Sequence, residues 1–166
     1  MAQSGELTDL IARFLKSGYV SNYGGINNSN LTDIINNMIN TFNIKYIICD
    51  VDGSIDNINI KQNQQIIINF QGHTITFNNK VAENIMFNNL GTLVLENCNF
   101  NGNNNNSMTI LKGVNLSKTL INNCNFLNFY EKDKTRQTHI IFTNSGSYSK
   151  IINCNFENIK QRGNGI

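Results

Sequence analysis

Apolar residues near the start of the chain recur with the period of an α-helix. Leu7, Leu10, Ile11, Phe14 and Leu15 fall at positions i, i+3, i+4, i+7 and i+8, which form one stripe on a helix surface. Gly18 follows the stripe at the place where a helix commonly ends. This pattern predicts a short amphipathic helix within residues 1–20.

A second, longer stripe follows after a polar interval. It consists of Leu31, Ile34, Ile35, Met38, Ile39 and Phe42. Asn30 stands at the N-cap position, and Asp33 lies in the first turn, where a carboxylate favours the helix dipole. We therefore expect a helix over residues 31–43. The interval of residues 21–30 is rich in Gly, Asn and Ser and is predicted to be a linker or hinge.

From residue 44 onward the apolar period changes from that of a helix to that of a strand. Short apolar stretches lie at residues 46–48, 58–60, 66–70, 74–77, 85–87 and 93–95. Asn and Gly separate them, and no helical pattern intervenes. The sequence therefore predicts an all-β domain over residues 44–166.

The tetrapeptide Asn-Cys-Asn-Phe occurs three times in this domain, and two apolar stretches precede each copy. Its cysteines are Cys98, Cys124 and Cys154, so the intervals are 26 and 30 residues. A repeat of this length with three short strands is typical of a solenoid. We expect Cys98, Cys124 and Cys154 to stack inside it, together with Phe100, Phe126 and Phe156, about 4.8 Å apart. The intervening Asn residues should turn the chain or pair with the Asn of the next coil.

The Cys98 repeat with its two echoes, and the earlier stretch of residues 66–75, resemble the coils of the right-handed parallel β-helix, or pectin-lyase-like, superfamily. The resemblance covers roughly residues 44–160 and implies a right-handed solenoid, which we estimate at about five coils. It also suggests that the helix of residues 31–43 caps the first coil. Members of this superfamily include polysaccharide lyases, glycoside hydrolases, adhesins and phage tail spikes, so the fold alone does not define a function.

The composition narrows the possible partners and cofactors. Charged residues make up 14% of the chain and the formal net charge is +2, which argues against binding to nucleic acid. No apolar run approaches the about 20 residues that span a bilayer, and the N-terminus does not resemble a secretory signal. Four cysteines without zinc-ligand spacing are expected to be reduced and buried, so we predict no metal and no cofactor.

Catalytic residues are not evident. Asp50, Asp52 and Asp56 are the one close acidic group, and the turn Asp52-Gly53 explains them at least as well as a cation site does. Glu96 and Glu157 have no acidic equivalents in the other coils, so no paired carboxylates are predicted. His73 and His139 have no matching ligands at suitable spacing, and the mixed charges after Tyr130 predict a solvated loop.

The expected function is that of a non-enzymatic structural or attachment protein of a phage-like virion, such as a tail spike, fibre or decoration component, synthesised in the host cytoplasm. The helix of residues 7–15 would dock to the particle or oligomerise. An uncovered last coil would favour a homo-oligomer, preferably a trimer, or contact with other virion proteins. Tyr130 and Tyr148 are candidate contacts for a host glycan. The alternatives are a carbohydrate-active enzyme and a glycan-binding adhesin module.

Overall fold

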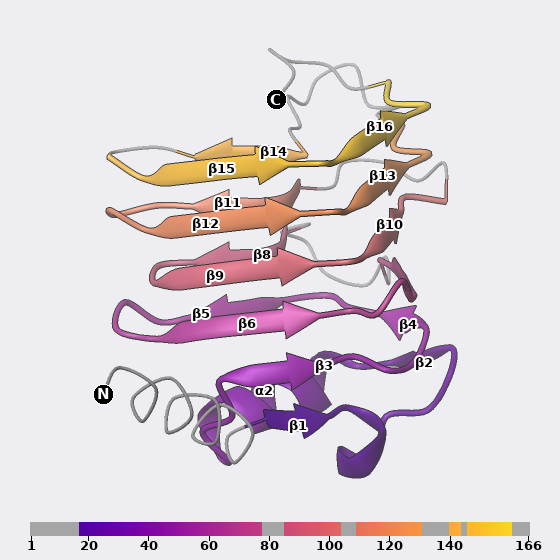
Figure 1. Ribbon diagram of the computed structural model, residues 1–166, viewed down its shortest axis with the longest axis vertical. Coiled ribbons are helices and arrows are strands. Elements are labelled where there is room, and N and C mark those ends of the chain that lie inside the picture. Colours follow the sequence, from indigo (N-terminus) through magenta and orange to yellow (C-terminus); the bar gives the residue numbers. More distant parts are fainter. Residues whose placement is uncertain (1–16, 78–84, 104–108, 131–139, 144–145, 161–166) are drawn as a thin grey trace, which may run out of the picture.

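A computed structural model describes residues 17–77, 85–103, 109–130, 140–143 and 146–160. These residues form a right-handed parallel β-helix with three parallel sheets (Figure 1). Sheet A contains β1 (Ser17–Tyr19), β3 (Tyr46–Ile48), β6 (Gln65–Asn69), β9 (Thr92–Glu96), β12 (Lys118–Asn122) and β15 (Tyr148–Ile152). Sheet B contains β2 (Ser29–Asn30), β4 (Gly53–Ser54), β7 (Thr74–Thr76), β10 (Asn99–Asn101), β13 (Asn125–Leu127) and β16 (Asn155–Glu157). Sheet C contains β5 (Ile58–Ile60), β8 (Ile85–Asn89), β11 (Thr109–Gly113) and β14 (Ile141–Thr143).

Each turn of the solenoid contributes one strand to sheet A, then one to sheet B and one to sheet C. About four turns are complete in this sense, beginning with β3, β6, β9 and β12. The solenoid that the sequence predicted is confirmed; the four complete turns are followed by the strands β15 and β16 of a further turn. Within the described residues, the last turn consists of β15 and β16, and the first turn contains a helix where later turns have a sheet C strand.

The first turn includes residues that the sequence assigned to a linker. β1 pairs with β3, and β2 pairs with β4, in both cases parallel. A 3-10 helix, η1 (Ser21–Tyr23), lies between them. Gly18 lies within β1. A Cβ atom at this position would come within 2.9 Å of the Tyr23 ring and 3.0 Å of the Met38 side chain, so close packing explains the glycine.

Helix α2 (Thr32–Asn40) completes the first turn and contacts β5. Its residues Ile35, Met38 and Ile39 are buried in the core. The helix is shorter than the predicted range of residues 31–43, and Leu31 occupies the N-cap position. Asn30 nevertheless stabilises this end, because its Oδ1 accepts a hydrogen bond from the backbone N–H of Thr32 at 2.9 Å.

The interior of sheet B is a column of aromatic rings. Phe100 lies opposite Phe126, and Phe126 lies opposite Phe156. The ring centroids are 5.3 Å apart in the first pair and 4.7 Å in the second, and both pairs are stacked. Phe100 and Phe126 are fully buried, whereas Phe156 is half-buried. The register that the Asn-Cys-Asn-Phe repeat implied is therefore the register of the strands.

The corner between sheets A and B is formed by asparagine in the left-handed conformation. The residues before Cys98, Cys124 and Cys154 are Asn97, Asn123 and Asn153, whose φ angles are +54°, +52° and +52°. Apart from glycine, asparagine is one of the residues that tolerate this conformation best. The first Asn of each repeat therefore permits the chain to turn from one sheet into the next.

Candidate functional site

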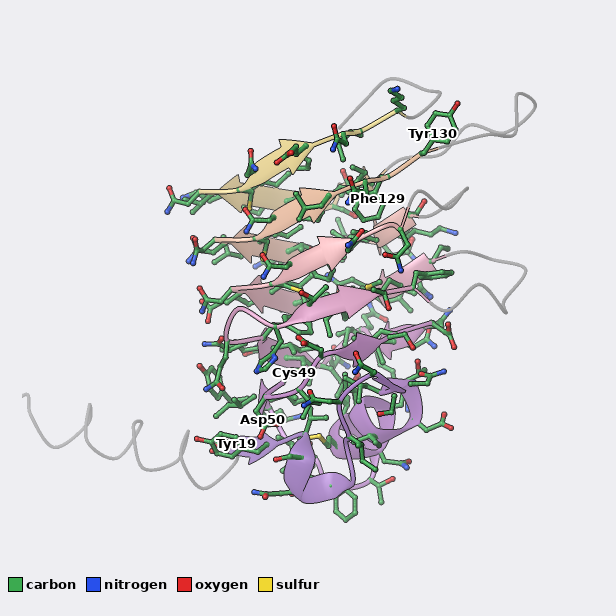
Figure 2. All side chains as sticks on the ribbon, turned by 90° about the vertical axis from the view of Figure 1, so that its right-hand side faces the viewer. Tyr19, Cys49, Asp50, Phe129 and Tyr130 are labelled. Carbon is green, nitrogen blue, oxygen red and sulfur yellow. The ribbon has the colours of Figure 1, made fainter. Side chains whose placement is uncertain are left out.

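The acidic residues of the segment between β3 and β5 do not converge on a common ligand position. Asp50 lies near the N-terminal end of the solenoid (Figure 2) and binds the first turn. Its Oδ1 accepts a hydrogen bond from the backbone N–H of Ser21 at 3.0 Å, and its Oδ2 accepts one from the Ser21 hydroxyl at 2.5 Å. Partial burial tends to raise the pKa of Asp50, but the hydrogen bonds from Ser21 together lower it below its ordinary value.

Asp52 is engaged with the following turn. Its Oδ1 accepts a hydrogen bond from the backbone N–H of Thr74 at 2.7 Å and lies 3.0 Å from Nδ1 of His73. The Thr74 N–H, followed by His73, lowers the pKa of Asp52. The backbone of Asp52 also contacts the first turn, because its N–H donates to Asn27 and its carbonyl accepts from the N–H of Asn28.

Asp56 binds the start of α2. Its Oδ2 accepts a hydrogen bond from Nδ2 of Asn30 at 2.8 Å, and its backbone N–H donates to the Thr32 hydroxyl at 2.8 Å. Asp50, Asp52 and Asp56 thus attach the first turn and its helix to the solenoid at three separate points. The described part of the chain contains no group of three or more His, Cys, Asp or Glu side chains that could hold a metal ion.

The four cysteines are free thiols in the solenoid interior or at its end. Cys49, Cys98 and Cys124 are buried, and Cys154 is half-buried in the last turn. Burial raises the pKa of Cys49 and that of Cys124 to about 12, and raises that of Cys98 well above its ordinary value. A thiolate is the nucleophilic form of cysteine, so these three buried side chains are unsuited to nucleophilic catalysis at neutral pH.

Asparagine side chains form ladders along the solenoid axis. In the first ladder, Asn123 donates from Nδ2 to Oδ1 of Asn97 at 2.7 Å, and Asn97 donates to Oδ1 of Asn69 at 3.1 Å. Asn69 in turn donates to the Tyr46 hydroxyl.

Two further ladders follow the same direction. One joins Asn125 to Asn99, and the other joins Asn158 to Asn128 and Asn128 to Asn101. In each of these bonds the amide N–H points toward the N-terminal end of the solenoid.

The two tyrosines expected to contact a glycan do not lie together. Tyr130 follows β13 at the end of a sheet B strand, near the C-terminal end of the solenoid (Figure 2). Tyr148 begins β15 in sheet A, beside Lys118. Their exposed fractions are 38% and 60%, and Nζ of Lys160 lies 5.9 Å from the centre of the Tyr130 ring. Each tyrosine is accessible, but the two belong to different sides of the molecule.

Some of the predicted features lie outside the described residues. These are the docking stripe of Leu7, Leu10, Ile11, Phe14 and Leu15, the charged loop of residues 131–137, and His139. No helix in the described segments has the length and apolar character needed to cross a membrane.

The structure reveals an apolar column that the sequence analysis did not identify. Tyr46, Ile67, Val94 and Leu120 are in register in sheet A and face outward, because they alternate with buried neighbours. The sequence contained a signal for this column. Outward positions of a strand are normally polar, but in β6, β9 and β12 they include the apolar residues Ile67, Val94 and Leu120. We call these four residues the outer column.

Comparison with known proteins identifies no relative of this chain. The chain matches no protein-family model, no curated protein and no solved structure.

Proposed function

We propose that this protein is a non-enzymatic structural or attachment component, in which a capped β-helix serves as a rigid body within a larger assembly. One observation carries the proposal: the described side chains most suited to chemistry are engaged in holding the fold. The side chains of Asp50 and Asp56 bind the first turn, and that of Asp52 binds the following turn. The buried thiols have raised pKa values, and the corner amides bond to one another.

The proposed setting is a phage-like virion, where the protein would be a tail spike, fibre or decoration component. Support comes from the resemblance of the repeats to pectin-lyase-like coils, a fold that such proteins share with carbohydrate-active enzymes. In this setting the predicted helix of residues 7–15 would attach the protein to the particle. The exposed Tyr130 and Tyr148 are suited to contact a host glycan, since an accessible aromatic ring offers both apolar surface and a hydroxyl.

The first test asks whether the chain is a particle component. Mass spectrometry of virus particles purified from the source of the sequence should detect it. A variant lacking residues 1–16, which leaves β1 intact, should fold normally but be lost from the particles. Its absence from particles of the unaltered source, or normal incorporation of the variant, would contradict the virion assignment.

A second measurement separates the structural role from catalysis. The full chain is incubated with capsular and pectin-type polysaccharides, and new reducing or unsaturated ends are assayed. We expect none, whereas binding on a glycan array is compatible with attachment. Sustained release of such ends would identify a carbohydrate-active enzyme instead.

A further inference from the structure

The outer column runs parallel to the solenoid axis on sheet A. Tyr46 lies opposite Ile67, Ile67 opposite Val94, and Val94 opposite Leu120. Each of the four side chains is partly exposed. Sheet A faces the viewer in Figure 1, and no described helix or strand is drawn across β6, β9 and β12. The column therefore forms a continuous apolar stripe on an accessible sheet face.

The other two sheets differ in their outward residues. On sheet B these residues include Thr74, Thr76, Asn99, Asn101 and Asn125, and Leu127 is an apolar exception. On sheet C, outward Asn59 lies opposite Asn88, and Asn88 lies opposite Lys112. An outward sheet face that meets water is normally polar. The apolar outer column thus sets sheet A apart as a face suited to contact another protein.

Opposite charges flank the column on its two sides. Glu96 ends β9 and lies on one side, whereas Lys118 begins β12 and lies on the other. Lys150 follows the outer column in register, since it lies opposite Leu120, and is exposed. When copies of one chain form a closed ring with parallel axes, one side of each copy faces the other side of the next. Glu96 of one copy would then face Lys118 of its neighbour, one strand spacing away.

We propose that the outer face of sheet A binds a second copy of this chain, with solenoid axes parallel and the outer columns turned toward a common axis. This inference rests on the proposed structural role and adds its partner. The face spans five strand spacings, about 24 Å, and a strand of five residues, about 17 Å. This area is smaller than the about 800 Å² per partner of a typical stable interface. The association should therefore be weak and populated only at high protein concentration.

The first experiment measures the mass of the full chain by light scattering and sedimentation over a range of concentrations. The test variant is Val94→Glu, which places a carboxylate in the middle of the outer column. The control is Asn59→Glu on the outer face of sheet C, where a carboxylate can still accept the hydrogen bond from Asn88. We expect the unaltered chain and the control to associate equally, and the Kd of Val94→Glu to rise at least about tenfold. Circular dichroism and thermal unfolding verify that both variants are folded.

The second experiment tests the arrangement through its charges. Glu96→Lys and Lys118→Glu should each weaken association, and the double variant should restore it, because the exchanged charges again attract across the interface. A monomeric unaltered chain, an unchanged Kd for Val94→Glu, or a double variant that fails to recover would each overturn the inference. A monomer would not decide the structural role, which is tested separately by the particle and polysaccharide experiments.

Discussion

At the scale of single residues, asparagine performs two tasks at the corner between sheets A and B. Asn97 and Asn123 adopt positive φ angles, and their side chains bond to the preceding turn. Glycine would adopt the positive φ angle but could not form the side-chain bond. Another polar residue could form the bond, but the positive φ angle would cost it conformational energy. Asparagine meets both requirements, which gives a physical reason for its recurrence before each cysteine of the repeat.

Two substitutions of Asn97 should separate these tasks. Asn97→Gly keeps the left-handed conformation and loses the ladder bonds, whereas Asn97→Ala loses both. A left-handed residue costs roughly 1 to 2 kcal/mol more when it carries a Cβ, so Asn97→Ala should lower the free energy of unfolding further than Asn97→Gly. Chemical denaturation of the three proteins measures the difference. Equal losses for Gly and Ala would show that the backbone conformation contributes nothing at this corner.

At the scale of elements, the sequence predicted the later turns better than the first. β3 and β5 have the bounds that the apolar pattern indicated, because each strand contributes its own buried residues. β1 and β2 were missed because their sequences, Ser-Gly-Tyr and Ser-Asn, contain no aliphatic residue and show no apolar alternation. They are held by distant partners, since β1 pairs with β3 and β2 pairs with β4, and no local pattern reveals these pairings.

In the candidate site, too, features set by the local repeat could be predicted from the sequence, and features set by distant partners could not. The stacking of the repeat phenylalanines could be predicted from spacing, because equal positions in successive coils come into register. The roles of Asp50, Asp52 and Asp56 could not, since each depends on a hydrogen-bond partner at least 21 residues away. The outer column required the registers of neighbouring strands, which a one-strand alternation pattern does not supply.

The attachment of the first turn should weaken in acid. Asp50 and Asp52 have lowered pKa values in the folded protein. Their contribution to stability is therefore present above the ordinary pKa of about 3.9 and is lost as the pH falls below it. Hydrogen exchange measured at pH 6 and near pH 3 should show preferential loss of protection at residues 20–31, where Asp50 binds Ser21, and at Thr74, whose N–H binds Asp52. Asp50→Asn, which removes the carboxylate that binds Ser21, should reduce the pH dependence at residues 20–31; uniform loss of protection along the chain would argue against this local attachment.

At the scale of the whole molecule, the core is continuous but not uniform along the axis. The side chains of Ile75, Phe100 and Phe126 are fully buried, whereas Phe156, in register with Phe126, is half-buried. β15 likewise has only partly buried or exposed residues. The contribution of equivalent residues to stability should therefore fall toward the last described turn.

A matched pair of substitutions tests this gradient. Phe126→Leu should lower the free energy of unfolding by about 1 to 2 kcal/mol, because it leaves unfilled volume between two stacked rings. Phe156→Leu removes the same atoms at a half-exposed position and should cost less than half as much. Chemical denaturation gives both values. Equal costs would mean that the last turn is packed as tightly as the middle of the solenoid in solution.

The asparagine ladders also bear on how the protein ages. Asparagine slowly deamidates when its side chain is attacked by the backbone nitrogen of the next residue. In the ladders, Asn97 and Asn123 are held by bonds to neighbouring turns. Conversion of Asn97 to aspartate would replace its donor by an oxygen facing the Asn69 oxygen, so damage at one position would disturb the adjoining turn. The folded ladders should thus preserve the asparagines on which they depend, and mass spectrometry of aged folded and unfolded protein would reveal that protection.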